Sequence, residues 1–268
     1  MLNELRAFQD GAPTSRMPVV FAGHGNPMNA ITDTPYSRAW KQVGEALPAP
    51  AAIVCISAHW MTHGSYVTAM PKPRTIHDFG GFPRDLFEVV YPAPGSPEMA
   101  AEVAAAEPRI ALDEEWGLDH GTWSVLVHMF PKADVPVLQV SLNGAIGPEA
   151  EYALLRNLRP LRERGVLFVG SGNIVHNLRT VRFQENAEPF DWAEEFDADV
   201  AGLLERGDHE GLIHYERLGE AARLSVPTDE HYRPMLAALA LSDPDEHPRF
   251  FNEGTDLGSI GMRSFVMG

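Results

Sequence analysis

Residues 51–60 read Ala51-Ala-Ile-Val-Cys-Ile-Ser-Ala-His59-Trp60, an almost unbroken apolar run that follows Pro48 and Pro50. Such a run predicts a strand buried on both faces, as the central strands of parallel sheets are. His59 stands where this strand is expected to end, and the carboxyl ends of strands in an open α/β sheet face the ligand crevice. One isolated histidine there is more often a hydrogen-bonded cap than a ligand, so a functional interpretation needs further histidines in comparable places.

Two further apolar runs end in small residues followed by a histidine. Residues 17–22 break at Gly23-His24-Gly25-Asn26-Pro27, and residues 165–171 run into Gly172-Asn-Ile-Val-His176-Asn177. A Gly-His-Gly sequence alone is typical of a turn, although glycine also lets the backbone approach a ligand closely. Residues 37–46 have helical spacing, so a right-handed β-α-β crossover is expected to place His24 and His59 at neighbouring strand ends.

The rest of the chain alternates predicted strands and helices. We expect strands at 65–69, 135–141 and 258–266, and helices at 97–106, 148–164 and 191–206. No internal repeat or low-complexity linker interrupts this alternation. It favours one doubly wound α/β domain over residues 1–268, with a mostly parallel central sheet flanked by helices. The Pro/Gly-rich segment 71–97 is expected to be a functional loop, and it carries His77.

Other histidines lie near predicted helix starts. His120 is expected in the loop before a helix that Thr122 caps, where a polar side chain can face a ligand. His231 is expected in the first turn of a helix that begins at Thr228, where the helix dipole disfavours protonation of an imidazole. His128 lies on the apolar face of its helix, and we interpret it as a packed, hydrogen-bonded histidine.

The charge balance excludes several classes of partner. The 268 residues include 21 Lys and Arg against 37 Asp and Glu, a net charge of -16 that repels nucleic acid and anionic membranes. A single cysteine, Cys55, allows no intrachain disulfide and fits a reducing compartment. The segment Met1–Asp10 lacks the apolar core of a signal peptide, and no run approaches the ~18 apolar residues that span a bilayer. We therefore expect a cytoplasmic protein.

The histidines taken together are stronger evidence for a metal site than any one of them alone. Imidazole suits zinc and iron, and a metal held by three protein ligands keeps positions open for substrate. The sequence contains no Cys-x-x-Cys, His-Glu-x-x-His or Gly-x-Ser-x-Gly pattern, which disfavours a zinc finger, a zinc metalloprotease and an α/β-hydrolase.

Seven motifs, spread over nearly the whole chain, give the sequence a resemblance to a known family. It resembles the class III (LigB-type) extradiol ring-cleavage dioxygenases, in the branch of DOPA 4,5-dioxygenase-like proteins. The motifs are Gly23-His-Gly-Asn-Pro27, Ile56-Ser-Ala-His-Trp60, His77-Asp-Phe-Gly-Gly-Phe-Pro83, Gly117-Leu-Asp-His-Gly-Thr-Trp123, Gly170-Ser-Gly-Asn-Ile-Val-His-Asn177, His231-Tyr-Arg-Pro234 and Met262-Arg-Ser-Phe265.

The resemblance implies roles for individual residues. It implies that His24, His59 and His231 hold a non-heme Fe(II), with zinc possible in the same site. His176 matches the histidine assigned as acid/base, and His120 matches a second active-site histidine that orients substrate or dioxygen. The same motif segments predict four substrate-binding residues, His77, Trp123, Asn177 and Tyr232.

Alternatives remain open for the third ligand and for the function. The wider class holds iron with two histidines and a carboxylate, and Asp229 and Glu230 keep a carboxylate ligand possible beside His231. Three neutral imidazoles leave the full charge on the metal, which an anionic catecholate would compensate. We therefore expect a dioxygenase that inserts both atoms of O2 into a DOPA-like catechol. A zinc-dependent hydrolase and a non-catalytic binding protein on the same scaffold are the alternatives.

Overall fold

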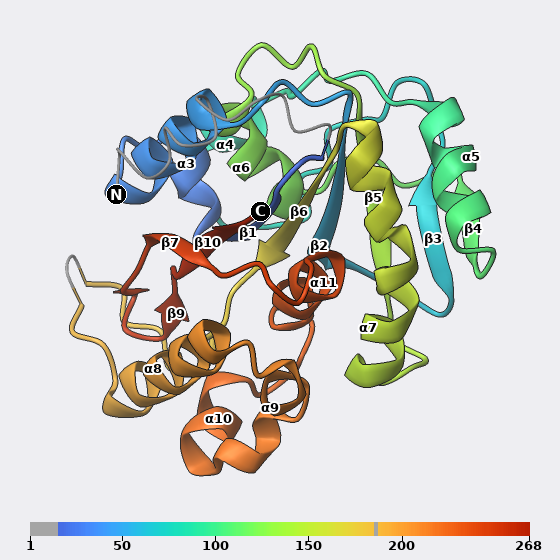
Figure 1. Ribbon diagram of the computed structural model, residues 1–268. Coiled ribbons are helices and arrows are strands. Elements are labelled where there is room, and N and C mark those ends of the chain that lie inside the picture. The colour runs from blue at the N-terminus through green and yellow to red at the C-terminus, as the bar shows by residue number, and fades with distance from the viewer. Residues whose placement is uncertain (1–15, 185–186) are drawn as a thin grey trace.

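A computed structural model describes residues 16–184 and 187–268 (Figure 1). Within these residues an eight-stranded sheet carries helices on both faces. Its strands, in spatial order, are β4 (Ile110–Asp113), β3 (Ser65–Thr68), β5 (Val137–Asn143), β2 (Ala52–Thr62), β6 (Val166–Gly172), β1 (Val19–Gly23), β10 (Ser264–Met267) and β7 (Arg249–Asn252). The four central strands β5, β2, β6 and β1 are parallel, whereas β10 and β7 extend the sheet in antiparallel fashion. The predicted α/β fold with a mostly parallel sheet between helices is confirmed.

Strand β2 is buried on both faces, as its apolar run predicts. Ile53 and Cys55 pack into the core on one side of the sheet, and Val54 and Ile56 pack into the core on the other side. This division follows from the strand geometry, because successive side chains point to opposite faces. The sheet therefore separates two hydrophobic cores.

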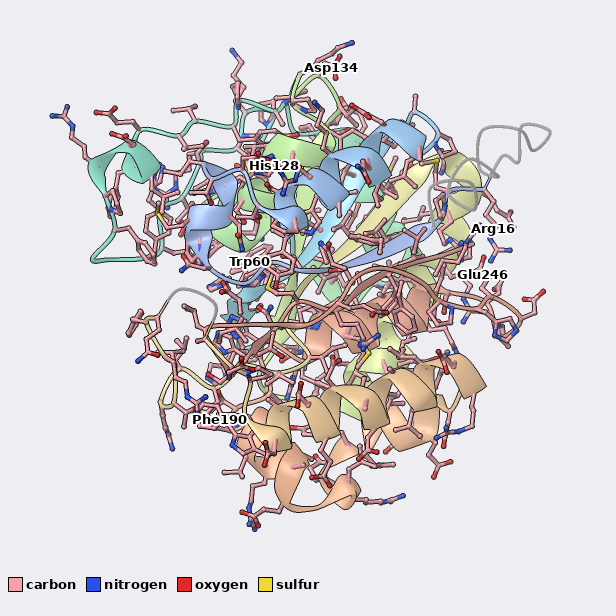
Figure 2. The ribbon with its side chains drawn as sticks, turned by 90° about the vertical axis from the view of Figure 1, so that its left-hand side faces the viewer. Arg16, Trp60, His128, Asp134, Phe190 and Glu246 are labelled. Atoms are coloured by element: carbon pink, nitrogen blue, oxygen red, sulfur yellow. The ribbon has the colours of Figure 1, made fainter. Side chains whose placement is uncertain are left out.

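The helices cover the two faces unequally. Those described are η1 (Pro27–Ala30), α3 (Pro35–Ala46), α4 (Arg84–Phe87), α5 (Pro97–Ala106), α6 (His120–Met129), α7 (Pro148–Leu155), η2 (Arg156–Arg164), α8 (Asp191–Arg206), α9 (His209–Ile213), η3 (Tyr215–Leu218), α10 (Glu220–Ser225) and α11 (Arg233–Leu241), of which η1, η2 and η3 are 3-10 helices. Helices α3 and α6 cover one face, and α5, α7, η2, α8, α10 and α11 supply the core of the other (Figure 1). His128 of α6 lies beside α3 (Figure 2), and its Nε2 donates to the Asn29 carbonyl at 2.8 Å, as expected for a packed histidine.

The predicted neighbourhood of the first two strands is wrong. Strand β6 lies between β1 and β2 and pairs in parallel with both. The connection through α3 therefore joins two strands that are not neighbours in the sheet. Strand β2 also continues to Thr62, so His59 lies inside the strand rather than at its end. The predicted strand over 258–266 is divided into β9 (Ile260–Gly261), which pairs with β8 (Thr255–Asp256), and β10.

Three predicted helix boundaries need correction. The predicted helix over 148–164 changes to a 3-10 helix at Arg156, because Pro160 has no N–H and its ring would clash with the carbonyl four residues earlier. Helix α6 begins at His120, since the Asp119 side chain accepts from the Thr122 N–H. Residues 229–232 form a turn, and α11 begins only at Arg233.

The membrane and signal-peptide predictions have different outcomes. Over residues 16–184 and 187–268, no helix has the length and apolar character needed to cross a bilayer. The segment Met1–Asp10 lies outside the described residues, and the cytoplasmic location stays a prediction.

Arg162 anchors the end of the sheet that is opposite to the histidines. Its side chain is 1% exposed and donates to the carbonyls of Met17 at 2.7 Å and Leu241 at 3.0 Å. Both of its terminal nitrogens donate to the Glu246 carboxylate at 2.8 Å. Figure 2 shows Arg16 beside Glu246, to which it is also paired at 3.1 Å. Arg162 therefore joins the chain before β1 to the end of α11.

We expect Arg162→Met to lower the free energy of unfolding by about 3–5 kcal/mol, because Glu246 would remain largely buried without its main partner. Urea unfolding followed by circular dichroism measures the loss. Arg164→Met is the matched control on the same 3-10 helix, because Arg164 is 58% exposed and paired with Glu102. That control should cost no more than about 1 kcal/mol. Equal losses in the two variants would contradict an anchoring role.

Candidate active site

The histidines lie where the pairing between the neighbouring strands β2, β6 and β1 ends. Pairing of β2 with β6 ends at Ser57 and Ser171, and pairing of β6 with β1 ends at Gly23. His24 follows β1 directly, His59 lies just beyond the last β2–β6 pair, and His176 follows β6. The crevice is therefore at the carboxyl ends of consecutive parallel strands, where ligands bind in open α/β sheets.

His231 reaches this crevice because the backbone before α11 packs directly on β6. The Asn173 N–H donates to the His231 carbonyl at 2.8 Å. A Cβ on Gly172 would lie 2.2 Å from that carbonyl oxygen, and a Cβ on Gly170 would lie 2.2 Å from the Pro234 carbonyl oxygen. Both positions require glycine, because any side chain would push the turn that carries His231 away from the sheet.

His24, His59 and His231, called the histidine triad below, can offer three nitrogens to one ion. One ring nitrogen from each lies within 4.8 Å of the others, and the Nε2 atoms of His24 and His59 are 3.3 Å apart. A tetrahedral metal with ~2.1 Å bonds to imidazole nitrogens would separate two ligand atoms by roughly 3.4 Å. The spacing and donor chemistry of the triad therefore fit a zinc or iron ion.

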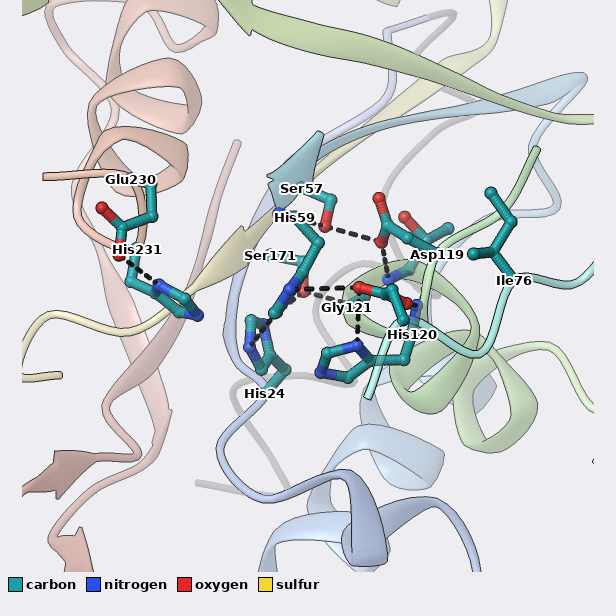
Figure 3. Close-up of polar contacts among 12 residues, drawn as sticks. His24, Ser57, His59, Ile76, Asp119, His120, Gly121, Ser171, Glu230 and His231 are labelled. Carbon is teal, nitrogen blue, oxygen red and sulfur yellow. Dashed lines mark hydrogen bonds and ion pairs between the residues drawn. The ribbon is translucent and has the colours of Figure 1, made fainter. Parts of the chain in front are cut away.

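Each triad histidine has a polar partner at Nδ1, so Nε2 is the nitrogen left for an ion, and those of His24 and His59 contact each other (Figure 3). The partners of His24, His59 and His231, in that order, are Ser171 Oγ at 3.0 Å, Asp78 Oδ2 at 3.2 Å and Glu230 Oε1 at 3.2 Å. Ser171 donates its own hydroxyl hydrogen to the Gly121 carbonyl, so it accepts from Nδ1. Outer partners of this kind fix the tautomer and orientation of histidine ligands. Glu230 thus serves here as a partner of His231, although its carboxylate, His176 and His231 also lie close enough to hold an ion.

Burial keeps two of the triad histidines neutral. It lowers the pKa of His24 and His231 well below the ordinary value, and the neighbouring imidazoles lower both pKa values further. Since a metal ligand must be a deprotonated imidazole, this shift prepares the site for a cation.

Asp78 joins the triad to His120. Its Oδ2 accepts from His120 Nδ1 at 2.9 Å as well as from His59, and its Oδ1 accepts from the His120 backbone N–H at 2.9 Å. Burial raises the pKa of Asp78, but the hydrogen bonds from His120 and His59 outweigh that effect and lower it. Asp78 was not predicted as a site residue, although it stands next to His77 in a motif segment.

His176 stacks against the triad. Its ring lies parallel to that of His231, with centroids 3.4 Å apart and 8° between the planes. Burial lowers the pKa of His176 to about 4, so its imidazole is neutral near pH 7 and can accept a proton. The structure thus brings together all five histidines predicted as metal ligands or catalytic residues.

A cavity of about 320 Å³ opens over these histidines. Beyond them it is lined by a set of side chains that we call the apolar wall. The wall consists of Phe79, Phe82, Leu178, Val181, Phe183, Leu257 and Ile260. The sequence did not predict these residues, because they come from three separate segments that show no periodicity, and of them only Ile260 lies in a strand, β9.

The four predicted substrate-binding residues lie outside the described lining of this cavity. The hydrogen bonds of His77 Nε2 to Val89, Trp123 Nε1 to Ile76, Asn177 Nδ2 to Leu224 and Tyr232 Oη to Leu212 all end on backbone carbonyls. Trp123 and Tyr232 are fully buried. The cavity lining therefore gives no support to direct contact with substrate for these side chains, and their substrate-binding role stays a prediction. His77 and Trp123 instead pack behind Phe79, with ring centroids 5.8 and 6.1 Å from it.

Comparison with known proteins agrees with this geometry. Residues 13–261 match the family described as the catalytic LigB subunit of aromatic ring-opening dioxygenase. A relative from Escherichia coli (strain K12), named 4,5-DOPA dioxygenase extradiol, is 45% identical over 262 residues, which cover 95% of this chain and 96% of that protein. The protein of the same name from Beta vulgaris is 33% identical over 255 residues, which cover 91% of this chain and 94% of that protein.

A solved structure is also similar over nearly the full length. The crystal structure titled as uncharacterized protein JW3007 from Escherichia coli K12 matches with a TM-score of 0.82 and 39% identity, covering 94% of this chain and 100% of that chain. The resemblance drawn from seven sequence motifs and the prediction of a dioxygenase are confirmed. This chain belongs to the LigB family of aromatic ring-opening dioxygenases.

Proposed function

We propose that residues 1–268 form one catalytic domain that inserts both atoms of O2 into a catechol-type substrate beside the diol. The observation that carries this proposal is the cavity in which the histidine triad and two further histidines meet. The bacterial and plant relatives are named for 4,5-DOPA dioxygenase, so DOPA belongs among the first compounds to test.

The resident ion of this proposal is Fe(II), although zinc fits the same three nitrogens. A bound Fe(II) would supply the electron transfer that ring cleavage by dioxygen needs. Three neutral imidazoles add no negative charge of their own, so the site favours a substrate that binds as an anion through its hydroxyl oxygens.

Two histidines outside the triad handle protons and orientation. His176 accepts a proton from a catechol hydroxyl and later returns it, because its imidazole is neutral and lies against His231. His120 donates through Nδ1 to Asp78, so the Nε2 of its neutral ring can accept a hydrogen bond from a substrate hydroxyl and orient the substrate. The buried position of both rings limits competition from water.

The test begins with anaerobic loading of the protein with Fe(II), followed by a panel of catechols that includes DOPA, and then by air. Oxygen uptake with formation of a yellow product is the expected result. A zinc-dependent hydrolase would instead act without dioxygen when loaded with zinc. A binding protein would show neither activity, and silence across the panel would contradict the proposal.

We expect His176→Ala to reduce turnover by about 10²–10⁴-fold, the usual contribution of general acid–base catalysis. Iron content, measured by metal analysis after anaerobic loading, should be unchanged because the triad is intact. Unchanged turnover at full iron content would remove the acid/base role from His176.

We expect Asp78→Asn to weaken iron binding by about 10–100-fold, because the amide offers one acceptor oxygen and no charge to the two imidazoles that Asp78 now holds. Competition with a chelator of known affinity measures the dissociation constant. Asp85→Asn, which removes an exposed carboxylate from the short helix α4 that follows Asp78 in sequence, is the matched control and should leave iron affinity unchanged. Wild-type affinity in the Asp78 variant would exclude a positioning role.

A further inference from the structure

We infer that Asp119, a buried carboxylate behind the histidine triad, is an electrostatic partner of the bound ion and supplies negative charge that the three imidazole ligands lack. The inference rests on the proposed function only in that the triad holds a divalent ion. Asp119 does not belong to the described groups that lie close enough to bind one ion, so it would act from outside the ligand set.

The first observation is that the Asp119 carboxylate accepts three hydrogen bonds. The Ser57 hydroxyl donates to it at 2.7 Å, the Thr122 N–H at 3.1 Å and the Gln139 amide at 2.6 Å. A carboxyl group that faces three donors is suited to its ionised form, which only accepts hydrogen bonds. As far as the chain is described, no Lys or Arg is paired with this carboxylate.

The second observation is that water does not screen this charge. Asp119 is 0% exposed, whereas the side chains of Asp78 and Glu230, the two carboxylates that contact the triad, are 18% and 28% exposed. Charges inside a protein interact more strongly than charges in water, because their surroundings are less polarisable. A buried charge is normally paired or lies at a metal site. The ion of the triad would therefore provide the cation that Asp119 lacks.

The third observation is the close approach of Asp119 to His59. Ser57 Oγ, which donates to Asp119, accepts from the backbone N–H of His59 at 3.2 Å (Figure 3). A Cβ on Gly121 would lie 3.4 Å from Asp119 Oδ1 and 2.9 Å from His59 Cδ2. The space of one methyl group thus separates the carboxylate from the imidazole. Within that ring Cδ2 is bonded to Nε2, the nitrogen left for the ion.

The carboxylate is also fixed in place. The backbone N–H of Asp119 donates to Gln139 Oε1 at 2.8 Å, and the backbone N–H of Gln139 donates to Thr68 Oγ1 at 2.9 Å. Asp119 is in addition the N-cap of α6. These contacts with β5, β3 and α6 hold the charge in one position, so it needs no rearrangement when an ion binds.

An exchange of two side chains, Asp119→Asn with Gln139→Glu, tests the inference, because it moves the charge and keeps the hydrogen bonds. The new amide oxygen at position 119 can accept from Ser57 and Thr122, and its NH2 group can donate to the new carboxylate at position 139. The other oxygen of that carboxylate can accept from the backbone N–H of residue 119, as Gln139 Oε1 does now. The net charge of the protein is unchanged.

The exchange should weaken the binding of Fe(II) and of Zn(II) about threefold to tenfold, as Coulomb's law gives for a unit charge moved a few ångström from a divalent ion at an effective dielectric constant of ~20. Competition with a chelator measures these affinities. The Fe(III)/Fe(II) potential, measured by redox titration, should rise because a nearby negative charge favours the more highly charged ion. An unchanged potential would overturn the inference even if the affinity fell, because a loss of affinity alone indicates displaced ligands.

A second variant keeps the inference testable if the exchanged protein does not fold. Asp119→Ser retains a residue type that caps helices and removes the charge altogether. It should weaken iron binding about 10–100-fold and raise the potential more than the exchange does. Glu107→Gln is the matched control, because it removes a carboxylate that is 3% exposed and paired with Arg109 just before the edge strand β4. Equal shifts of the potential in the control and in the Asp119 variants would contradict a specific role.

These measurements need no turnover, so they separate the inference from the proposed function. If the wild-type protein cleaved no catechol but the potential shifted as expected, the proposed dioxygenase activity would fail and the role of Asp119 would stand. If catechols were cleaved and the potential did not move, the activity would stand and the inference would fail.

Discussion

Three imidazoles from distant parts of the chain must share one small space to offer their nitrogens to one ion, and the rest of the site depends on this constraint. A protonated imidazole there would lose hydration and face two neighbouring rings. The contacts of Nδ1 with Ser171, Asp78 and Glu230 orient the three rings, because each occupies one ring nitrogen and leaves Nε2 for an ion. The site is therefore prepared for a cation before one arrives, and the preparation lies in the outer hydrogen bonds as much as in the histidines.

The fold supplies these partners by separating strands that are paired along most of their length. Strands β2 and β6 are hydrogen-bonded to each other up to Ser57 and Ser171. His59 lies beyond the last of these pairs, but it is still part of the continuous strand β2. Ser171 connects three parts of the structure, because it lies on β6, accepts from His24 after β1 and donates to Gly121 in α6. The buried part of the sheet thus positions His24 and His59, whereas Asp78 and the turn that carries His231 come from loops.

The sequence predicted what depends on local pattern. The apolar run at 51–60 predicted a strand buried on both faces, and the change from apolar to small residues predicted the positions of His24 and His176. The direction in which a loop side chain points was harder to predict from the sequence. Trp123 and His77 belong to motif segments of the site, yet they point behind Phe79, because membership of a motif does not say which side of a loop a residue faces. The apolar wall and the bridging role of Asp78 arise from contacts between distant segments, and no local pattern encodes them.

The position of His231 also has a consequence for the order in which the protein assembles. His24 and His59 lie in the first quarter of the chain, whereas His231 arrives only when the turn before α11 settles on Gly170 and Gly172 of β6. A nascent or partly folded chain therefore offers an ion two imidazoles but not the third. Contacts between residues so far apart in sequence form late, after the entropy of closing a long loop has been overcome. High affinity for the ion thus belongs to the completed fold, and binding would stabilise that state over the intermediates that precede it.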